Sequence, residues 1–381
     1  MIQIIDKYNC CGCSACVQTC PKQCISFEED EQGFRYPLFD KELCIECGLC
    51  EKVCPCKNQN EPQKPLNVYA AINPNEEIRM QSSSGGIFSM LAESIIDDGG
   101  VVFGVRFDRN WEVVHDFTDT KDGLSAFRGS KYLQSRIGES YKQVLDFLKQ
   151  GRKVLFSGTG CQVAGLKKFL RRDYDNLLSI EILCHSVPSP LVWRRYLKEV
   201  SGGQEVINVN FRDKKSGWSN YAYSIVINHK GGMYTEPASG LYMKGLTSNL
   251  TTRPSCSHCP SRFGKSGADI VLGDCWGIWN LKPEMDDNKG ISIVETFSPK
   301  GQNFISDLSF EYTEVQLEEL VKYNSGLSTM KPIHKEYKRF FVEIESNIPV
   351  SIAINKYLHT SNKSLFSKLK QVLLSILKRI K

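Results

Sequence analysis

The spacing of apolar and polar positions divides the chain into a short N-terminal part and a much longer remainder. In the N-terminal part, two short strands around a turn at Gly33 are predicted by the alternation in "CISFEEDEQGFRYPLFD". Residues 58–67 are polar and contain two prolines, which indicates a linker. We therefore expect a small domain over residues 1–57, followed by this linker.

From residue 68 onward, strand-length apolar runs alternate with amphipathic helical patterns. Helices are predicted by "GGIFSMLAESIIDDGG", "ESYKQVLDFLKQG", "CQVAGLKKFLRR" and "SPLVWRRYLKEV". Strands are predicted by "VVFGVRF" paired with "EVVHDF", and by "KVLFSG", "LLSIEIL", "YAYSIVIN" and "ISIVETF". This alternation predicts a larger mixed α/β or α+β domain over residues 68–310. We expect the remainder, residues 311–381, to be helical.

The last residues, "SLFSKLKQVLLSILKRIK", place apolar side chains at helical spacing between lysines and an arginine. This pattern resembles an amphipathic helix that lies in a membrane interface. The alternative is a helix that packs on its own domain and exposes its basic face to solvent.

The two interpretations of the tail predict different vesicle binding. If the tail binds membranes, the full-length protein sediments with anionic liposomes and a chain truncated at Ser361 stays in the supernatant, because the basic face that attracts anionic lipids is then missing. Equal sedimentation of the two chains would rule the membrane interpretation out.

Composition narrows the class of protein. The 381 residues are 41% hydrophobic and 24% charged, which is an ordinary globular balance. Because no signal-peptide core and no run of about 18 apolar residues occurs, we expect a cytoplasmic protein, peripheral at the inner face of the membrane if the tail binds there. The net charge of +5 is mild, so we expect no nucleic-acid partner. The 16 clustered cysteines indicate metal or redox chemistry.

Two cysteine boxes repeat the spacing C-x2-C-x2-C-x3-C-P, ending at Pro21 and at Pro55. In bacterial two-cluster ferredoxins, the fourth cysteine of each such box ligates the other cluster. One 4Fe–4S cluster is therefore predicted on Cys10, Cys13, Cys16 and Cys54, and a second on Cys44, Cys47, Cys50 and Cys20. A pair of zinc knuckles is the alternative, but zinc favours separated ligand pairs, often with histidine. Outside this pattern, packed thiols are expected at Cys11, Cys24 and Cys56.

Four further cysteines follow predicted strands or form a C-x2-C loop: Cys161, Cys184, Cys256 and Cys259. Ligands gather at strand ends in open α/β sheets, so these residues could complete a third four-thiolate site. The spacing leaves other interpretations open: a C-x2-C pair that holds nothing, a zinc site with His185 or His258, and packed thiols. The segment "SSSGG" before a predicted helix is similarly open between a phosphate cradle and an ordinary N-cap.

The sequence resembles the coenzyme F-420 hydrogenase/dehydrogenase beta-subunit family, in the branch with an N-terminal two-cluster ferredoxin module. The resemblance rests on segments in family order, among them "SSSGGIFSMLAESIIDDGGVVFGVRFD", "FRGSKYLQSRIGESYKQV", "KVLFSGTGCQVAGLKKFL", "LLSIEILCHSVPSP", "CSHCP" and "ADIVLGDCWG". It implies a flavin-binding large domain that carries FAD and its own 4Fe–4S cluster, with ligands at Cys161, Cys184, Cys256 and Cys259.

The resemblance also implies candidate FAD contacts and catalytic residues. The FAD contacts map onto Ser83, Ser84, Gly85, Gly86, Lys131, Tyr132, Gln134 and Thr159. Lys131 is a candidate cation near the flavin and His185 a candidate proton donor, against the alternatives of an exposed lysine and a structural neighbour of Cys184. The chain departs from the family at Gly160, where relatives have proline, at Ser186, where they have glycine, and at Cys275, where an aromatic residue is usual. We expect Cys275 to be a packed thiol.

The expected function is an iron–sulfur flavoprotein oxidoreductase. It would pass electrons between a ferredoxin-type carrier, the clusters and FAD, and reduce or oxidise a small organic substrate. Relatives of this shape are often associated with surface-polysaccharide synthesis. The alternatives are an electron-transfer subunit without its own substrate site and an F-420-dependent reductase or dehydrogenase subunit. The sequence does not indicate an oligomeric state.

Overall fold

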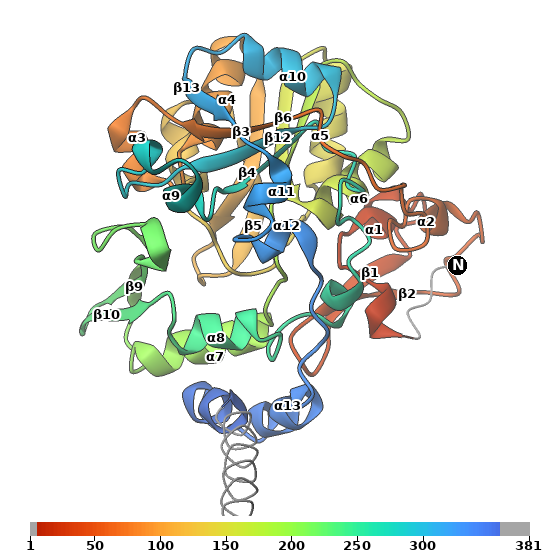
Figure 1. Cartoon of the computed structure of the whole chain (residues 1–381). Helices are drawn as coiled ribbons and strands as arrows, with labels where there is room; N and C mark the ends of the chain where they lie inside the picture. Colours follow the sequence, from red (N-terminus) through yellow and green to blue (C-terminus); the bar gives the residue numbers. More distant parts are fainter. Residues whose placement is uncertain (1–5, 359–381) are drawn as a thin grey trace, which may run out of the picture.

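The computed structural model describes residues 6–358 and shows the cysteine-rich N-terminal part beside a large sheet (Figure 1). Its hairpin pairs β1 (Ile25–Glu29) with β2 (Arg35–Phe39). Gly33 makes the turn with a φ of +83°, a conformation that glycine adopts without steric cost. Short helical segments flank the cysteines of the boxes: η1 (Lys7–Asn9), α1 (Ala15–Thr19) and α2 (Leu49–Lys52).

Within the described residues, eight strands form the main sheet in the order β13-β3-β12-β11-β7-β6-β4-β5. The four middle strands β11, β7, β6 and β4 run parallel, and antiparallel strands extend both sides. The predicted mixed α/β architecture is therefore confirmed. The strands are β3 (Asn67–Ile72), β4 (Val101–Phe107), β5 (Val113–Thr118), β6 (Val154–Thr159), β7 (Leu177–Ile182), β11 (Ile270–Asp274), β12 (Ser292–Thr296) and β13 (Glu311–Glu314).

Helices cover both faces of the main sheet. Successive residues of a strand point to opposite faces, and on β6 Leu155 packs in the core under α4 and α10 while Phe156 packs in the core under α5 and α6. These helices are α4 (Ile87–Asp97), α5 (Ser140–Lys149), α6 (Gly160–Leu170) and α10 (Pro299–Ser306). The shorter helices of this part are α3 (Glu76–Gln81), η2 (Asp122–Phe127), η3 (Ser219–Tyr221), α9 (Ile278–Leu281) and η5 (Pro283–Met285).

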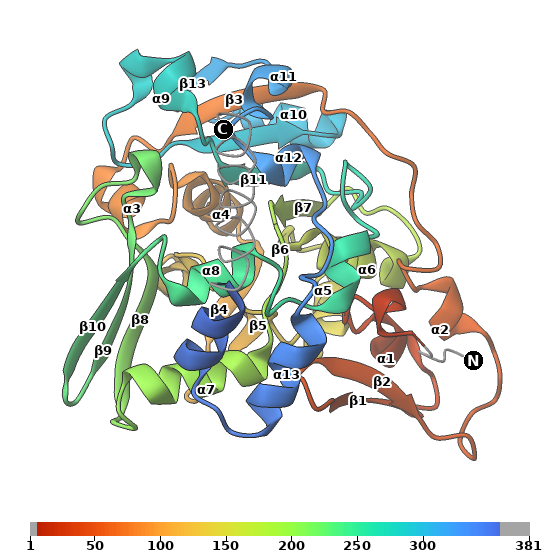
Figure 2. The same ribbon diagram turned by 60° about the horizontal axis from the view of Figure 1, so that its bottom comes forward.

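A second, smaller sheet has the order β10-β9-β8 and lies beside the main sheet with its own helices (Figure 2). Its side chains share one apolar core with α7, α8 and α13. The elements are α7 (Pro190–Val200), β8 (Val206–Asp213), β9 (Ser224–His229), β10 (Gly232–Pro237), α8 (Leu241–Thr247) and α13 (Tyr337–Glu345).

The N-terminal part is packed into the large domain rather than tethered beside it. Cys13, Ala15 and Val53 are buried in the same core as α5 and α6, and Phe34 is buried in the core of the smaller sheet. The segment expected to be a linker has no regular secondary structure up to residue 66, but it is held along the large domain. Leu66 N, for example, donates to Thr296 O at 2.7 Å.

The C-terminal region differs from the expected helical segment at its beginning. Glu311–Glu314 form the edge strand β13, which pairs antiparallel with β3. None of its four residues is buried, which suits a strand at the edge of the sheet. Helices then follow as α11 (Leu317–Leu320), α12 (Ser325–Ser328) and α13.

The basic tail over residues 364–381 lies outside the described residues. No helix within residues 6–358 is long and apolar enough to span a bilayer.

Candidate metal centres and cofactor site

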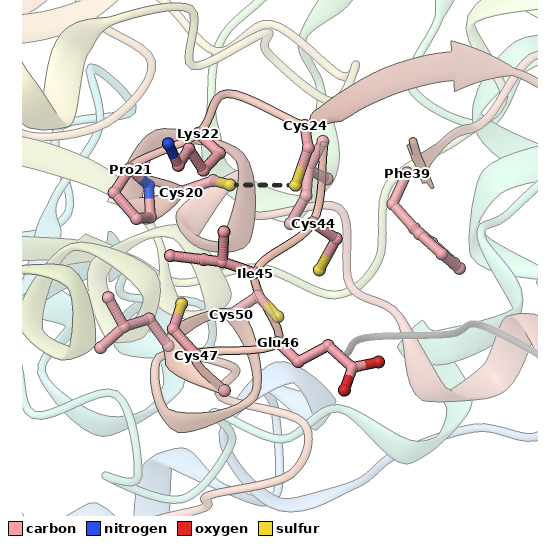
Figure 3. A pocket seen from close by; sticks show the side chains of 13 residues that line it. Cys20, Pro21, Lys22, Cys24, Phe39, Cys44, Ile45, Glu46, Cys47 and Cys50 are labelled. Atoms are coloured by element: carbon pink, nitrogen blue, oxygen red, sulfur yellow. Dashed lines mark hydrogen bonds between the residues drawn. The ribbon is translucent and has the colours of Figure 1, made fainter. Parts of the chain in front are cut away.

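Four cysteines line a hollow of about 400 Å³ near the surface, and we call them the outer cysteine site: Cys20, Cys44, Cys47 and Cys50. Figure 3 shows these thiols with Cys24, whose Sγ lies 3.3 Å from Cys20 Sγ. Cys47 is exposed, and Gly48 opens the turn into α2 with a φ of +70°. The hollow brings the fourth cysteine of the first box to the triplet of the second, which is the grouping that the sequence predicts.

The inner cysteine site, defined as Cys10, Cys13, Cys16 and Cys54, is buried against the large domain. Burial raises the pKa of the Cys16 thiol, and the neighbouring Cys13 and Cys10 raise it further. Cys54 likewise lies within electrostatic reach of Cys13. Four thiols this close and this buried are costly to ionise unless they bind a metal group.

Gly12 explains how the first box approaches the large domain so closely. Its φ is +71°, and a Cβ at this position would lie 2.9 Å from Gln134 Nε2 and 3.0 Å from Arg253 Nη1. A side chain at residue 12 would therefore displace the ends of the Gln134 and Arg253 side chains, in a backbone conformation that favours glycine.

The large-domain cysteine site consists of Cys161, Cys184, Cys256 and Cys259, which all line one hollow of about 480 Å³. Cys161 and Cys184 follow the ends of β6 and β7, which are adjacent parallel strands. Cys256 and Cys259 come from the 3-10 helix η4 (Pro254–His258) and its C-cap. The sheet and this helix therefore gather cysteines that lie far apart in the sequence. Cys11 of the N-terminal part lines the same hollow.

The walls of this hollow carry polar groups without partners. Ser255 Oγ, Ser261 Oγ and Arg262 Nε are buried and have no hydrogen-bond partner among the described residues. Buried donors are normally satisfied, so this arrangement fits a bound group that accepts hydrogen bonds. The sulfides and thiolates of an iron–sulfur cluster are such acceptors.

The zinc alternative is not supported by the geometry. Among the described residues, no three His, Cys, Asp or Glu side chains are arranged to hold a single metal ion. A 4Fe–4S cluster places several iron and sulfur atoms between its thiolates, so its ligands stand farther apart than those of one ion. Four cysteines at each site are the ligand set that a 4Fe–4S cluster requires.

The departure at Gly160 has a physical reason in this chain. A Cβ at Gly160 would lie 2.7 Å from Oε1 of Glu181, so the proline that relatives have would displace this side chain. Burial raises the pKa of Glu181 to about 7. The Glu181 carboxylate thus occupies the space beside Cys161 that a side chain at position 160 would need.

Burial lowers the pKa of both candidate catalytic residues, His185 and Lys131. Burial, followed by the charge of Arg262, lowers the pKa of His185 to about 4, so its imidazole is neutral near pH 7. A neutral imidazole does not favour the role of proton donor. Lys131 donates from Nζ to Ala126 O at 3.0 Å and to Arg128 O at 2.8 Å, and burial lowers its pKa to about 7. Both catalytic roles stay predictions.

The serines of "SSSGG" do not cap α4. Gly86 is the N-cap, with a φ of +81°, and no side chain caps this helix. Ser84 donates from Oγ to Ile291 O at 2.6 Å, and Ser83 Oγ accepts from Ser130 N. A Cβ at Gly85 would lie 2.4 Å from Ala71 O, so the loop packs against β3 as only glycine allows. The segment therefore caps α4 through Gly86 and not through a serine side chain.

Two buried cations that the sequence reasoning missed hold this loop. Arg212 donates to Ser83 O at 2.9 Å, to Tyr132 Oη at 3.2 Å and, with two bonds of 2.8 Å, to Asp274. Its Nε is buried without a partner in the described part of the chain. Arg212 therefore joins two of the candidate FAD contacts.

Lys214 is the second cation at the loop. Its Nζ donates to Arg79 O at 2.6 Å, Ser84 O at 3.1 Å and Lys289 O at 2.6 Å. Burial lowers its pKa to about 7, and the charges of Arg212 and Arg79 contribute to this decrease. An anion at the loop would stabilise the charged form of Lys214. The residues present therefore fit a phosphate group.

The other two candidate FAD contacts lie at the cysteine sites instead. Gln134 donates from Nε2 to Cys11 O at 2.7 Å, and Thr159 Oγ1 lies 3.3 Å from Cys161 Sγ. Thr159 also forms a capping box with Gln162 at the start of α6. These contacts favour structural roles near the clusters for both residues.

Two segments of the chain match models of known families. Residues 151–322 match the family model for the C-terminal part of the coenzyme F420 hydrogenase/dehydrogenase beta subunit, and residues 9–58 match that of the 4Fe–4S dicluster domain. No curated protein matches the sequence significantly. Among solved structures, one similar chain belongs to the F420-reducing NiFe hydrogenase complex from Methanosarcina barkeri. It shares 17% identity over 79% of this chain and 93% of that one, with a TM-score of 0.47. The chain thus joins a 4Fe–4S dicluster domain to a segment related to the C-terminal part of F420 hydrogenase/dehydrogenase beta subunits.

Proposed function

We propose that the chain is an iron–sulfur flavoprotein oxidoreductase that exchanges electrons with a ferredoxin-type carrier and acts on a small organic substrate. The observation that carries this proposal is the large-domain cysteine site, where four thiols and three unpartnered donors of the described residues surround one hollow. When bound, 4Fe–4S clusters transfer single electrons and FAD transfers two electrons or a hydride. Such a combination couples a one-electron carrier to a two-electron reaction.

The burial of the thiols increases from the outer to the inner cysteine site, which supports a direction of electron transfer through the protein. The outer cysteine site is partly exposed and contains the exposed Cys47, whereas every thiol of the inner site is buried. Cys11, which follows the first inner thiol in the sequence, lines the large-domain hollow. This order supports electron entry from an external carrier at the outer site and passage through the inner site to the large domain.

The proposed FAD site is the loop Ser83–Gly86 with Lys131 and Tyr132. Backbone amides before α4 would hold the pyrophosphate at the positive end of this helix. Arg212 and Lys214 support this proposal because they place two buried cations on the same loop. Asp274 neutralises Arg212, but Lys214 Nζ bonds only to carbonyl oxygens among the described contacts.

Replacing Lys214 with Met is expected to weaken FAD binding by at least about tenfold, because the loop loses a buried cation beside the pyrophosphate. The FAD content of the purified protein and its Kd for FAD measure this loss. Lys289→Met is the matched control, since Lys289 lies on the neighbouring segment but pairs with Glu76 at the surface. Equal FAD affinity in the wild type and Lys214→Met would contradict the site, provided that thermal stability is retained.

Turnover of a substrate would distinguish the proposed oxidoreductase from an electron-transfer subunit that has no substrate site. The test is anaerobic reaction of the holoprotein with reduced ferredoxin and candidate nucleotide sugars, which a role in surface-polysaccharide synthesis predicts as substrates. Reduced F-420 in place of ferredoxin tests the F-420-dependent alternative. Flavin reduction without turnover of any candidate would favour an electron-transfer protein that lacks its own substrate site.

A further inference from the structure

Arg253 is a fully buried cation at the junction of the N-terminal part and the large domain. Its guanidinium donates to Cys10 O at 2.8 Å, to Arg35 O at 2.9 Å and to Gln134 Oε1 at 3.1 Å. Nη2 also lies 3.7 Å from Cys10 Sγ, a thiol of the inner cysteine site. Its acceptors among the described residues are neutral oxygens and this sulfur, so no carboxylate of the described part neutralises it.

The same residue reaches the large-domain cysteine site through its backbone. Arg253 is the N-cap of η4, and its carbonyl accepts a hydrogen bond of 3.0 Å from Cys256 N. Arg253 therefore lies between two predicted clusters, with its side chain at a thiol of the inner site and its backbone at Cys256 of the large-domain site.

The surroundings of Arg253 strengthen its field. The guanidinium carbon lies 4.3 Å from the ring centre of Tyr36 and 5.6 Å from that of Phe34, so aromatic rings separate the charge from water. An unpaired charge in such a place is costly because it loses its hydration. Anionic clusters on both sides would offset this cost, because charges interact strongly where water is excluded.

We propose that Arg253 sets the reduction potentials of the inner and large-domain clusters by stabilising their reduced states. Each reduction adds one electron, supplied by the ferredoxin-type carrier, and so adds one negative charge beside the guanidinium. A fixed positive charge raises the potential of the couple, as hydrogen bonds and net charge do in iron–sulfur proteins generally. No thiol of the outer site contacts Arg253 among the described contacts, so electrons are drawn inward. This inference rests on the proposed electron-transfer function.

The alternative is that Arg253 only fastens the two parts of the chain together. Arg194 provides a matched control, because it also joins the parts, from α7 to Glu29 on β1, and its described partners include no cysteine. Arg253→Gln keeps a hydrogen-bonding side chain and removes the charge, whereas Arg253→Lys keeps a charge. The readout is the midpoint potential of each cluster, followed by electron paramagnetic resonance in a redox titration of the anaerobic holoprotein.

We expect Arg253→Gln to lower at least one midpoint potential by about 59 mV or more, which is a tenfold change in the ratio of reduced to oxidised cluster. Arg253→Lys should give a smaller shift, and Arg194→Gln none. Unmoved midpoints in Arg253→Gln with a full iron content would overturn the proposal. So would an equal shift in Arg194→Gln, which would assign the effect to docking.

A second variant keeps the proposal testable if Arg253→Gln does not retain its clusters. Gln134→Glu places a carboxylate within the existing 3.1 Å contact with Arg253 Nη1 and neutralises the cation, while it removes the hydrogen bond that Gln134 Nε2 donates to Cys11 O. Lowered midpoints in this variant support the proposal, and unchanged midpoints overturn it. If the wild type lacks the large-domain cluster, its iron content shows this directly, and the inner cluster still tests the role of Arg253.

Discussion

Replacing Cys184 with Ser is expected to lower the iron content of the anaerobically purified protein from about twelve per chain toward about eight. The large-domain site would then keep three thiolates and gain a hydroxyl, which binds a cluster poorly. Cys184 lies at the end of β7 and lines the hollow with Cys161, Cys256 and Cys259. Total iron, together with the resonance signals of the remaining clusters, measures the loss.

Cys275→Ser is the control for this experiment. Cys275 is 1% exposed and packs in an apolar core with Trp218 and Trp276, and it does not line the hollow. Its replacement should leave the iron content unchanged, although it removes one thiol from the same domain. An iron content near eight in the wild type would contradict the prediction of a cluster in the large domain. Loss of all iron in Cys184→Ser would show instead that the inner cluster depends on its neighbour.

The sequence predicts much of the large domain because its signals are local. The run "KVLFSG" becomes β6 and "LLSIEIL" becomes β7, and their parallel pairing places Cys161 and Cys184 at one edge of the sheet. The grouping of the box cysteines follows from their spacing together with the two-cluster ferredoxin pattern, in which the fourth cysteines are exchanged. The placement of Cys161 and Cys184 needs only the periodicity of each segment and the rule that parallel strands end at the same edge.

The contacts that join the sites could not be predicted in this way. Arg253 meets Cys10 across 243 positions of sequence, and no pattern around "TTRPSC" indicates a buried charge. Arg212 and Lys214 lie in "NFRDKKSGW", where cations are usually solvated, and only the packed structure shows that they are buried. The edge strand β13 was missed because a strand of four residues leaves little periodicity.

Electron uptake is expected to depend on the outer cysteine site. Cys47→Ser should slow flavin reduction by a ferredoxin-type donor by at least about tenfold, or about 1.4 kcal/mol in the barrier. The reason is that Cys47 is the exposed thiol of the site that faces solvent, while the inner site is enclosed by the large domain. Dithionite, a small reductant, should still reduce the flavin. The measurement is stopped-flow absorbance of the flavin with each reductant.

Cys13→Ser provides the comparison that locates the step. Cys13 packs against α6, where a Cβ at Gly165 would lie 3.0 Å from Cys13 Cβ, so this change acts at the inner site. If the two sites work in series, both variants slow reduction by the carrier, but only Cys13→Ser leaves an outer cluster that the carrier can still reduce. Its reduced signal should then accumulate without flavin reduction. Unchanged reduction of the flavin by the carrier in both variants would remove the outer and inner sites from the path, and leave the large-domain site as the point of electron uptake.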